Sequence, residues 1–332
     1  MGVAMAIKAA ELAKMCNVSR MTVDRALKNK KGIKEETRLR ILKMAEEYGY
    51  RPNFLASSLS TGTTHSIGII VFDLYNQHFS YMVNAMEKYL SEQGFLSYIC
   101  ISDKNPERER QLIDDLCDRK VDGIAFVPIN ISSEFCEHVH AKGVPVVAVS
   151  NRLKGFPFVG GDGAAAVYSG MECFYNHGYR TIHFVCPPMR FKNQQNIYTQ
   201  EDRLNGYLSF IKAHPEVHGE VITTSDYIDR LVRLVSNPEE RPGVFCSSDH
   251  YTLMIRKRFI ELGWDLNKCC YLMGFDGLDY LNHLTPRPTS VYYPAEDIGR
   301  AAAQMLLDII HGHSADREVL LPCPIMQGTV KM

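Results

Sequence analysis

Residues 16–28 combine a tight turn with a short helix whose outer face is basic and polar. The apolar residues of this helix recur at i, i+3 and i+4 and can pack on a preceding helix: Val23, Ala26 and Leu27. The residues on the opposite side are Arg20, Met21, Asp24 and Arg25. Arginine side chains on such a face can donate hydrogen bonds to base edges in the major groove. The pattern predicts a helix-turn-helix with residues 20–28 as the recognition helix, although an amphipathic helix pair without any DNA role shows the same spacing.

The residues that follow favour the DNA-binding interpretation. Residues 37–48 predict a third helix, and Gly49 ends it. One side of that helix carries an apolar stripe: Ile41, Met44, Ala45 and Tyr48. A short segment rich in small residues, 54–60, comes after Pro52 and Asn53.

The N-terminal region resembles the headpiece of the lactose-repressor family of bacterial transcription regulators. That headpiece reads A-G-V-S-x-x-T-V-S-R-x-L-N, then T-R-x-x-V, then G-Y-x-P-N-x-x-A-x-x-L. The matching residues at the same spacing are Val18, Ser19, Thr22, Val23, Arg25, Leu27, Thr37, Arg38, Gly49, Tyr50, Pro52, Asn53, Ala56 and Leu59.

Three residues depart from the family pattern. Asn17 replaces a glycine, which is tolerable because asparagine accepts a left-handed backbone better than most residues. Asp24 replaces a serine; its carboxylate could accept from a cytosine amino group or pair with a neighbouring arginine. Lys34 replaces the serine that usually caps the third helix, which predicts a weaker helix start.

The helix face and the resemblance together predict the residues that contact double-stranded operator DNA: Ser19, Arg20, Met21, Thr22, Arg25, Asn53, Ala56 and Leu59. Residues 54–60 are too few for a stable isolated helix. They are expected to form a hinge helix only on operator DNA, with Leu59 wedged into the minor groove.

Charge and cysteine content agree with this organisation. The formal net charge of the chain is −1, but residues 1–64 hold 12 basic and 6 acidic residues, a net charge of +6, whereas residues 65–332 carry a net charge of −7. A basic headpiece on an acidic body suits local phosphate binding. The ten cysteines are scattered without a C-x-x-C pair, so neither a metal site nor a disulfide framework is expected. No secretory signal or 18-residue apolar stretch is found, and a cytoplasmic protein without membrane association is expected.

From residue 66 onwards, apolar strand-like runs alternate with helical segments. Strands are predicted at 66–72, 95–102, 121–128 and 144–149, with helices at 80–93, 106–120 and 133–141 between them. A second series follows: helix 163–177, strand 181–186, helix 201–213, strand 219–224, helix 226–236, strand 243–246, helix 249–262 and strand 270–274. The alternation predicts an α/β fold with doubly wound parallel sheets and ligand sites at the carboxyl ends of the strands.

The resemblance covers nearly the whole chain, through pieces such as Val121-Asp-Gly-Ile, Gly178-Tyr-Arg-Thr-Ile and Pro288-Thr-Ser-Val. It implies an all-α headpiece at 1–52, a hinge and linker at 53–64, and an effector-binding and dimerisation domain at 65–332. Two lobes resembling periplasmic sugar-binding proteins are implied, one about 65–162 and 291–320, the other about 163–290 and 321–332. The chain would cross between them three times.

Matched one residue at a time, the resemblance also implies which residues contact an effector in the cleft between the lobes: Asn76, His78, Phe79, Asp162, Arg203, Tyr227, Asp249 and Asp276. Arg203 could fork onto hydroxyls or a carboxylate, and the two aspartates after apolar strands could accept from a polyol. Each has a structural alternative. Arg203 could be a surface arginine, Asp162 a helix cap, Phe79 a core residue and His78 merely solvated. The loop 187–200 could determine specificity or be variable surface.

Together with these residues, the resemblance implies a ligand-responsive repressor that binds a pseudo-palindromic operator as a homodimer. The effector expected is a sugar or a related metabolite. A dimer is expected because each chain has one headpiece and no heptad tail follows the final strand-like segment. Two other classes remain as alternatives: an α/β enzyme and a free sugar receptor. No G-x-x-x-x-G-K-[ST] or G-x-G-x-x-G motif supports a nucleotide cofactor, and no cofactor is expected.

Overall fold

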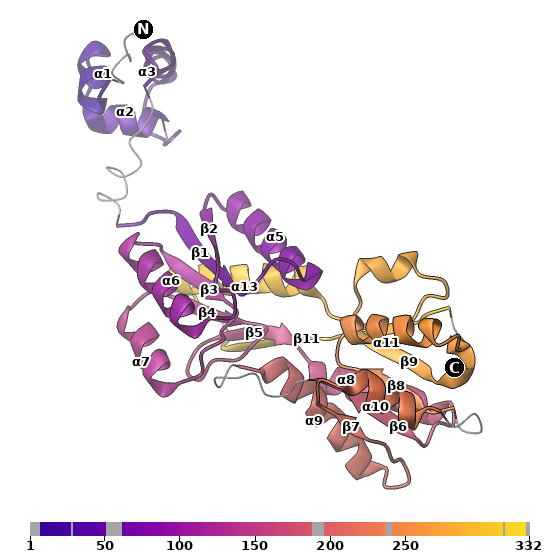
Figure 1. Cartoon of the computed structure of the whole chain (residues 1–332). Coiled ribbons are helices and arrows are strands. Elements are labelled where there is room, and N and C mark those ends of the chain that lie inside the picture. The colour runs from indigo at the N-terminus through magenta and orange to yellow at the C-terminus, as the bar shows by residue number, and fades with distance from the viewer. Residues whose placement is uncertain are drawn as a thin grey trace. The chain divides into compact units, whose positions relative to one another are not determined.

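A computed structural model describes residues 7–27, 29–50, 62–187, 196–236, 241–314 and 316–329. The chain folds into two compact units, Met1–Thr64 and His65–Met332. The first unit is helical and the second is α/β (Figure 1). The fold class predicted from the sequence is therefore confirmed.

The first unit contains three helices, α1 (Ala9–Met15), α2 (Arg20–Leu27) and α3 (Glu35–Glu47). They enclose a small apolar core made of Leu12, Ala13, Cys16, Val23, Ala26, Ile41 and Ala45. The turn between α1 and α2 needs a left-handed residue, and Asn17 adopts it with φ of 51°. The substitution of asparagine for glycine at this position is therefore accommodated by the backbone, as expected.

The starts of α2 and α3 are held in different ways. The Thr22 backbone N–H donates to Ser19 Oγ at 3.1 Å, so Ser19 caps α2. Lys34 precedes α3 without a side-chain cap. Instead, Arg38 Nε donates to Glu35 Oε2 at 2.9 Å within the first turn of α3. This ion pair between exposed side chains stabilises the helix only weakly.

The second unit begins with a six-stranded parallel sheet in the order β11-β5-β4-β3-β1-β2. Its strands are β1 (Ser66–Val71), β2 (Leu96–Ile101), β3 (Gly123–Phe126), β4 (Val146–Val149), β5 (Phe158–Gly161) and β11 (Glu318–Leu321). Its helices are α5 (Gln77–Glu92), α6 (Pro106–Asp118), α7 (Ser133–Ala141) and α13 (Ala295–Ile310). We call this sheet with its helices the first lobe. Strand β5 was not predicted from the sequence, since it is short and half glycine.

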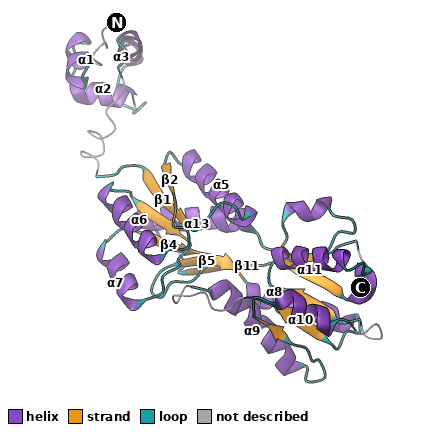
Figure 2. Ribbon diagram, viewed as in Figure 1, coloured by secondary structure: helices purple, strands orange, loops and turns teal. Residues whose placement is uncertain are grey.

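Helices cover both faces of this sheet (Figure 2), and the side chains of β1 point alternately towards one face and the other. Ile67 and Ile69 face a core shared with α5 and α13. Ile70 points to the other face, where Ile113 of α6 and Phe135 of α7 cover it. Because successive side chains of a strand point to opposite faces, a continuous apolar run is needed when both faces are covered.

The second lobe is built around a six-stranded sheet in the order β12-β10-β9-β8-β6-β7, in which β12 is antiparallel to β10. Its strands are β6 (Ile182–Val185), β7 (Val221–Ile222), β8 (Gly243–Cys246), β9 (Tyr271–Asp276), β10 (Thr289–Tyr292) and β12 (Ile325–Met326). Its helices are α8 (Gly163–Asn176), α9 (Tyr198–Ala213), α10 (Tyr227–Leu234), α11 (Asp249–Glu261), the short α12 (Leu266–Cys269) and the 3-10 helix η1 (Asp279–His283). Phe174 of α8 and Phe210 of α9 pack on one face, whereas Leu231 of α10 and Phe259 of α11 pack on the other.

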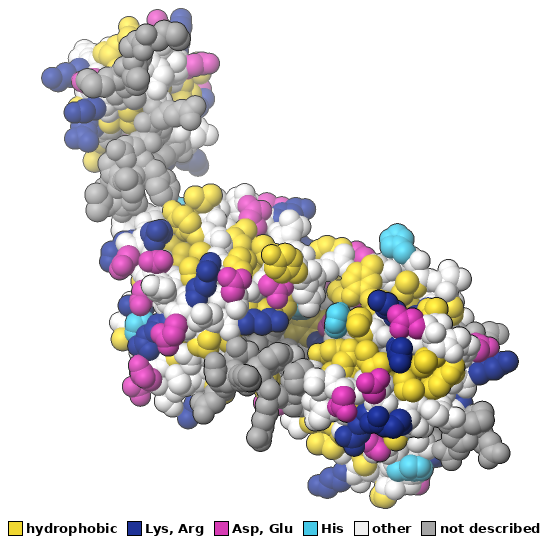
Figure 3. All heavy atoms as spheres, in the orientation of Figure 1, with side chains coloured by type: hydrophobic (Ala, Val, Ile, Leu, Met, Phe, Trp, Pro, Cys, Tyr) yellow, Lys and Arg dark blue, Asp and Glu magenta, His cyan; other side chains and the backbone are white. Residues whose placement is uncertain are grey.

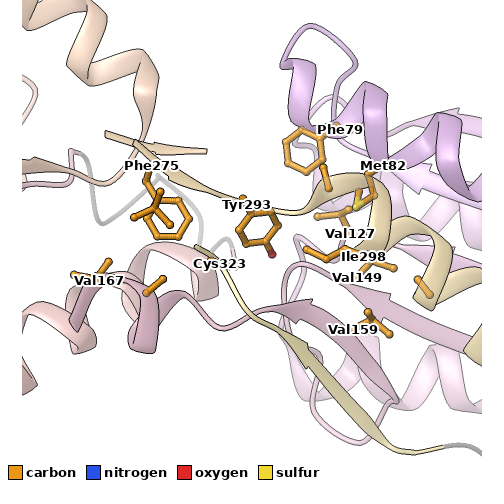
Figure 4. Close-up of a cluster of buried hydrophobic side chains, with 14 of the residues drawn as sticks. Phe79, Met82, Val127, Val149, Val159, Val167, Phe275, Tyr293, Ile298 and Cys323 are labelled. Atoms are coloured by element: carbon orange, nitrogen blue, oxygen red, sulfur yellow. The ribbon is translucent and has the colours of Figure 1, made fainter. Parts of the chain in front are cut away.

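The chain passes between the two sheets three times, after β5, after β10 and after β11. The three crossing segments pack against one another at Gly161, Tyr293 and Cys323 (Figure 4). A Cβ on Gly161 would lie 2.5 Å from the Tyr293 ring and 2.7 Å from Cys323 Sγ. The Gly161 N–H donates to Tyr293 Oη at 3.0 Å. Only glycine lets these crossings approach so closely.

Some apolar side chains remain on the surface of the first lobe. Strand β2 lies at an edge of its sheet, and its Leu96 and Ile99 are 62% and 45% exposed. Figure 3 shows apolar side chains gathered over the region of β2 and α5. Among the described residues, no helix has the length and apolar character needed to cross a bilayer.

Candidate functional site

The second helix of the first unit presents a polar and basic face. Arg20 and Arg25 are exposed, and Met21 is 71% exposed. Thr22 is half-buried and its hydroxyl lies 2.9 Å from Ser19 Oγ, so both residues also support the start of α2. Arg20, Met21 and Arg25 are therefore the members of the predicted set that are available to a partner.

The predicted hinge contacts Asn53, Ala56 and Leu59 lie outside the described residues. Residues 188–195, most of the polar loop before α9, lie outside them too. The expectations for these segments stay predictions.

The second unit contains a cavity of about 300 Å³ where strand ends of the two sheets meet. The first lobe contributes residues that follow β1 and β4, including Asn76, His78, Phe79, Ser150 and Asn151. The second lobe contributes residues of α9 and residues near the ends of β8 and β9, including Thr199, Arg203, Ser247, Ser248 and Asp276. Tyr293, in the crossing after β10, completes this wall. Carboxyl ends of strands are the expected position for ligands in sheets of this kind.

Arg203 and Asp276 form a buried ion pair at the wall of the cavity. Arg203 Nη2 lies 3.2 Å from Asp276 Oδ1, and both side chains are about a tenth exposed or less, at 10% and 8%. The guanidinium carbon lies 3.7 Å from the centre of the Phe275 ring, and Arg203 Nη1 donates to the Ser247 carbonyl oxygen. Stacking and hydrogen bonds on several sides hold the guanidinium in one orientation. This pair can offer both donors and an acceptor to a polar ligand.

Asp276 has an unusual backbone and an altered acidity. Its φ is 116°, and Gly277 after it has φ of 67°. Burial raises the pKa of the Asp276 carboxyl, while the positive charge of Arg203 opposes that shift. Ser248 Oγ donates to Asp276 Oδ2 at 2.7 Å. A Cβ on Gly277 would lie 2.8 Å from Tyr292 Cα, so both its positive φ and its close contact with β10 favour glycine at this position.

Asp249 does not line the cavity, contrary to the sequence-based expectation. Its side chain is fully buried, with Oδ1 accepting from Ser290 Oγ at 2.7 Å and Oδ2 accepting from the Leu278 N–H at 3.1 Å. Burial raises the pKa of Asp249, and the nearby charge of Asp276 raises it further. A Cβ on Gly274 would lie 2.0 Å from Asp249 Oδ1, so glycine makes room for this carboxylate. Asp249 therefore holds the segment after β9 in place through its hydrogen bond with the Leu278 N–H, on the side away from the cavity.

His78 and Phe79 reach the cavity from the start of α5. Asn76 caps this helix, since its Oδ1 accepts from the His78 N–H at 3.1 Å. The His78 ring packs edge-on against Tyr293, with centroids 4.7 Å apart. Burial lowers the pKa of His78 to about 3, and the charge of Arg203 adds to this shift. His78 is therefore a buried neutral ring at physiological pH rather than a solvated one.

Asp162 and Tyr227 are placed away from the cavity. Asp162 Oδ1 accepts from the Ala165 N–H at 3.0 Å and caps α8, which is the structural alternative recognised in the sequence. Tyr227 packs edge-on against Tyr251 with centroids 5.4 Å apart, and it contacts the core between α10 and α11.

Sequence reasoning missed several polar residues that lie at the junction of the lobes. Asn196 donates from its backbone N–H to the Ile129 carbonyl at 2.7 Å and from Nδ2 to the Arg152 carbonyl at 2.7 Å. Thr199 Oγ1 donates to Asn151 Oδ1 at 3.4 Å. A signal was available for Asn151, because polar residues directly after a buried parallel strand belong to the ligand-binding edge. No group of metal-ligating side chains is found in the described part of the chain.

Comparisons with known proteins agree with this architecture. Residues 9–53 match the family described as bacterial regulatory proteins, lacI family, and residues 171–330 match a periplasmic binding protein-like domain. Catabolite control protein A of Priestia megaterium is 24% identical over 318 residues, covering 93% of this chain and 94% of that protein. The probable HTH-type transcriptional repressor ExuR of Bacillus subtilis strain 168 is 27% identical over 325 residues, covering 94% of each chain.

The fold is also found among solved structures. A crystal structure of the lac repressor dimer bound to operator and the anti-inducer ONPF superposes with a TM-score of 0.83 at 17% identity, covering 98% of this chain and 99% of that one. A complex of the transcriptional regulator CelR with cellobiose superposes with a TM-score of 0.68 at 21% identity, covering 98% and 100%.

Proposed function

Because the chain belongs to the lacI family of bacterial regulatory proteins, we propose that it is a transcriptional repressor controlled by a small polyhydroxylated effector. It binds a pseudo-palindromic operator as a homodimer in the cytoplasm, where that DNA is found. The observation that carries the proposal is the oriented Arg203–Asp276 pair at the wall of a cavity between two lobes.

The chemistry of the cavity supports a sugar or sugar derivative. Its size suits a small ligand, and its walls combine aromatic rings with hydroxyl, amide and charged groups. A guanidinium beside a carboxylate can bind neighbouring hydroxyls, one as donor and the other as acceptor. The rings of Phe72 and Phe79 add apolar surface on the first-lobe side.

We propose binding rather than catalysis for this cavity. Its one acidic side chain among the described lining residues, Asp276, is engaged by Arg203 and Ser248. The His78 ring packs against Phe79 and Tyr293 and is held in the neutral form by burial. Although Ser248 Oγ donates to Asp276, the positive charge of Arg203 beside this carboxylate weakens it as a base for activating the hydroxyl.

Ligand contacts with both lobes provide a route to control of DNA binding. Occupancy favours one relative position of the lobes, which shifts the arrangement of the two headpieces in a dimer. Such coupling is typically worth about 1–3 kcal/mol, or roughly 5- to 150-fold in operator affinity. The same linkage requires operator DNA to change effector affinity by an equal factor.

The test separates effector binding from DNA binding. A sugar library is screened by thermal unfolding of the full chain, since a ligand at about 100 times its Kd adds about 2.7 kcal/mol of stability. Operator affinity is then measured by fluorescence anisotropy against the concentration of the ligand found. Arg203→Ala and Asp276→Ala are expected to bind operator but to ignore that ligand.

Arg233→Ala is the matched control, because Arg233 is an exposed arginine of α10 that does not line the cavity. It should respond with the parental midpoint. If Arg203→Ala and Asp276→Ala also keep the parental midpoint, the proposed site is wrong. If no ligand changes operator affinity, control by an effector is wrong.

A further inference from the structure

We propose that the second lobe carries a binding site for the phosphate group of a small phosphate ester, in a pocket at the amino ends of β6 and β8. This pocket belongs to one lobe and is separate from the cavity between the lobes. The site therefore goes beyond the proposed function and does not depend on it.

The pocket lies where the chain enters two neighbouring strands, and its volume is about 470 Å³. Thr181 directly precedes β6 and Pro242 directly precedes β8, whereas the cavity between the lobes lies at the opposite ends of the strands. The other lining residues come from the turn after α8, the loop before β7 and the approach to β8: His177, Gly178, Tyr179, Arg180, His218 and Arg241. Two guanidinium groups and two imidazoles thus share one pocket, and its described lining residues include no carboxylate.

Arg241 has hydrogen-bond donors that are left without acceptors. Its Nε and Nη2 are shielded from solvent and meet no acceptor among the described residues. Its guanidinium carbon lies 5.9 Å from the centre of the Tyr271 ring, near the limit of a cation–π contact. Buried donors of a charged group that make no bond cost free energy, and a bound ion is one way to satisfy them. Because no hydrogen bond holds these two nitrogens, the guanidinium can turn towards an anion in the pocket without breaking one.

Arg180 is held in place with part of its guanidinium left over. Its Nη1 donates to the carbonyl oxygens of Tyr175 and Tyr179, each at 2.9 Å. The guanidinium carbon lies 3.9 Å from the centre of the Tyr175 ring, so the group also stacks on that ring. These contacts engage one nitrogen at the end of α8. The Nε and Nη2 donors are therefore the ones that Arg180 can offer to an anion.

The two carboxylates of the loop before β7 are engaged away from the pocket. Glu216 Oε1 accepts from Tyr175 Oη at 2.7 Å. Glu220 Oε2 lies 2.7 Å from Arg230 Nη2 in an ion pair. Neither glutamate lines the pocket. An anion that enters it thus meets positive charge on the described walls, which favours its binding.

Donors from separate segments suit a tetrahedral phosphate better than a flat carboxylate. Arg180 follows α8 and Arg241 precedes β8, and the Thr181 hydroxyl, 3.0 Å from His218 Nε2, lies between these segments in the list of strands that the pocket joins. A phosphate group has three or four oxygens and accepts paired N–H groups from a guanidinium. The pocket is larger than a phosphate ion alone, which leaves room for the rest of an ester.

The test measures anion binding to the full chain by calorimetry at constant ionic strength. The probes are inorganic phosphate, glycerol 3-phosphate and phosphoserine, and acetate and glycerol are the comparisons. We expect the phosphates to bind at least about tenfold more tightly than acetate, because they accept more charge-assisted hydrogen bonds. A lower Kd for an ester than for inorganic phosphate would support the space for the rest of the molecule. Equal Kd values would overturn the ester and leave an inorganic phosphate site.

Substitutions assign the binding to the two arginines. Arg241→Gln and Arg180→Gln should each raise the Kd for phosphate about tenfold or more, since each removes charge-assisted bonds. Arg233→Gln is the matched control and should keep the parental Kd, because Arg233 is an exposed arginine of the same lobe that does not line the pocket.

A stability measurement separates ligand binding from a structural role of Arg241. Arg241→Met keeps an unbranched apolar stem and removes the buried donors, so in phosphate-free urea unfolding it should be at least as stable as the parent. Added phosphate should then stabilise the parent but not this variant. A marked loss of stability in Arg241→Met without phosphate would show that the guanidinium is structural and would overturn the proposal.

Two further results would also overturn this site. One is a folded parent that binds no phosphate probe. The other is parental affinity in both Arg241→Gln and Arg180→Gln, which would place the anion elsewhere on the molecule. Neither result bears on the proposed function, which is tested separately through Arg203 and Asp276.

Discussion

Arg20 and Arg25 are among the few residues of the recognition helix that remain available to contact DNA, because most of its other residues pack in the core or hold the start of the helix. Val23 and Ala26 are buried in the headpiece core, and Ser19 with Thr22 forms the start of the helix. The two arginines are exposed on α2, with guanidinium groups that can bond to guanine in the major groove or to phosphate.

We expect at least one of these arginines to read a base. Replacing a base-reading arginine should cost about 1–3 kcal/mol and relax the preference at one operator position, whereas losing a phosphate contact weakens binding to all sequences alike. Operator selection followed by affinity measurement on Arg20→Ala and Arg25→Ala distinguishes these cases. Unchanged specificity in both variants would show that neither arginine reads sequence.

At the residue scale, the sequence correctly predicted cavity-lining side chains where the family match also placed them after the end of a strand or at the start of a helix beside the cavity. Asn76, His78, Phe79, Arg203 and Asp276 line the cavity. The matched aspartate Asp249 is instead buried behind it, where its carboxylate accepts from the Leu278 N–H in the loop after β9 and from Ser290 Oγ of β10. A sequence shows that an aspartate follows a strand. It does not show which way the carboxylate turns once neighbouring N–H groups compete for it.

The loop after β3 shows how one helix positions part of the cavity wall. Glu109 of α6 is fully buried and accepts from the N–H groups of Ile129 at 2.8 Å and Asn130 at 2.9 Å. Ile129 lines the cavity, and its carbonyl accepts from the Asn196 N–H of the second lobe. Burial raises the pKa of Glu109 to about 7, while the two backbone N–H groups hold it below what burial alone would produce.

Glu109 should therefore make stability depend on pH. Its folded pKa is raised above the ordinary value of 4.5, so the folded chain binds the proton more tightly than the unfolded chain does. Its stabilising contribution is complete below about pH 4.5 and is lost as pH rises through about 7, by an amount on the order of 3 kcal/mol. Urea unfolding of the parent and of Glu109→Gln at several pH values measures this difference.

Glu109→Gln cannot ionise, but it has one oxygen for two backbone N–H groups, so it should be less stable than the parent at pH 5. That deficit should shrink towards pH 8. Glu107→Gln, at an exposed position of the same helix, is the control and should show no such trend. A constant difference between parent and Glu109→Gln across this range would contradict the raised pKa.

Elements were predicted well where apolar runs were long and poorly where they were short. The run at β1 and the helices α8 and α11 agree with their predicted ranges within a residue. The predicted strand 219–224 shrinks to two paired residues in β7, because this strand lies at the sheet edge and has one neighbour. The glycine-rich β5 was missed because half of its residues are glycine and one of its two neighbours, β11, is distant in sequence.

At the scale of the whole molecule, alternation of strands and helices was sufficient to predict two doubly wound lobes, because parallel strands need helical crossovers. It could not show how tightly the crossings pack. Gly161, Tyr293 and Cys323 meet from three separate passages of the chain. A contact among residues so far apart in sequence leaves no periodic signal, and only the family resemblance indicated three crossings.

The assembly is expected to be a dimer, because one headpiece per chain can occupy only one half of a pseudo-palindromic operator. A second copy would bury apolar side chains that the isolated chain leaves exposed, and the edge strand β2 is the place in the first lobe where Leu96 and Ile99 are available. Replacing both residues by aspartate should favour the monomer in sedimentation experiments. Operator affinity should fall roughly hundredfold or more, since the two headpieces would no longer bind as a linked pair.

Ile131→Asp is the control, because Ile131 is 51% exposed but lies outside β2. A parental chain that sediments as a tetramer at micromolar concentration would refute the dimer. A double variant that remains dimeric would place the second copy on another surface, while loss of operator binding without loss of the dimer would separate assembly from DNA recognition.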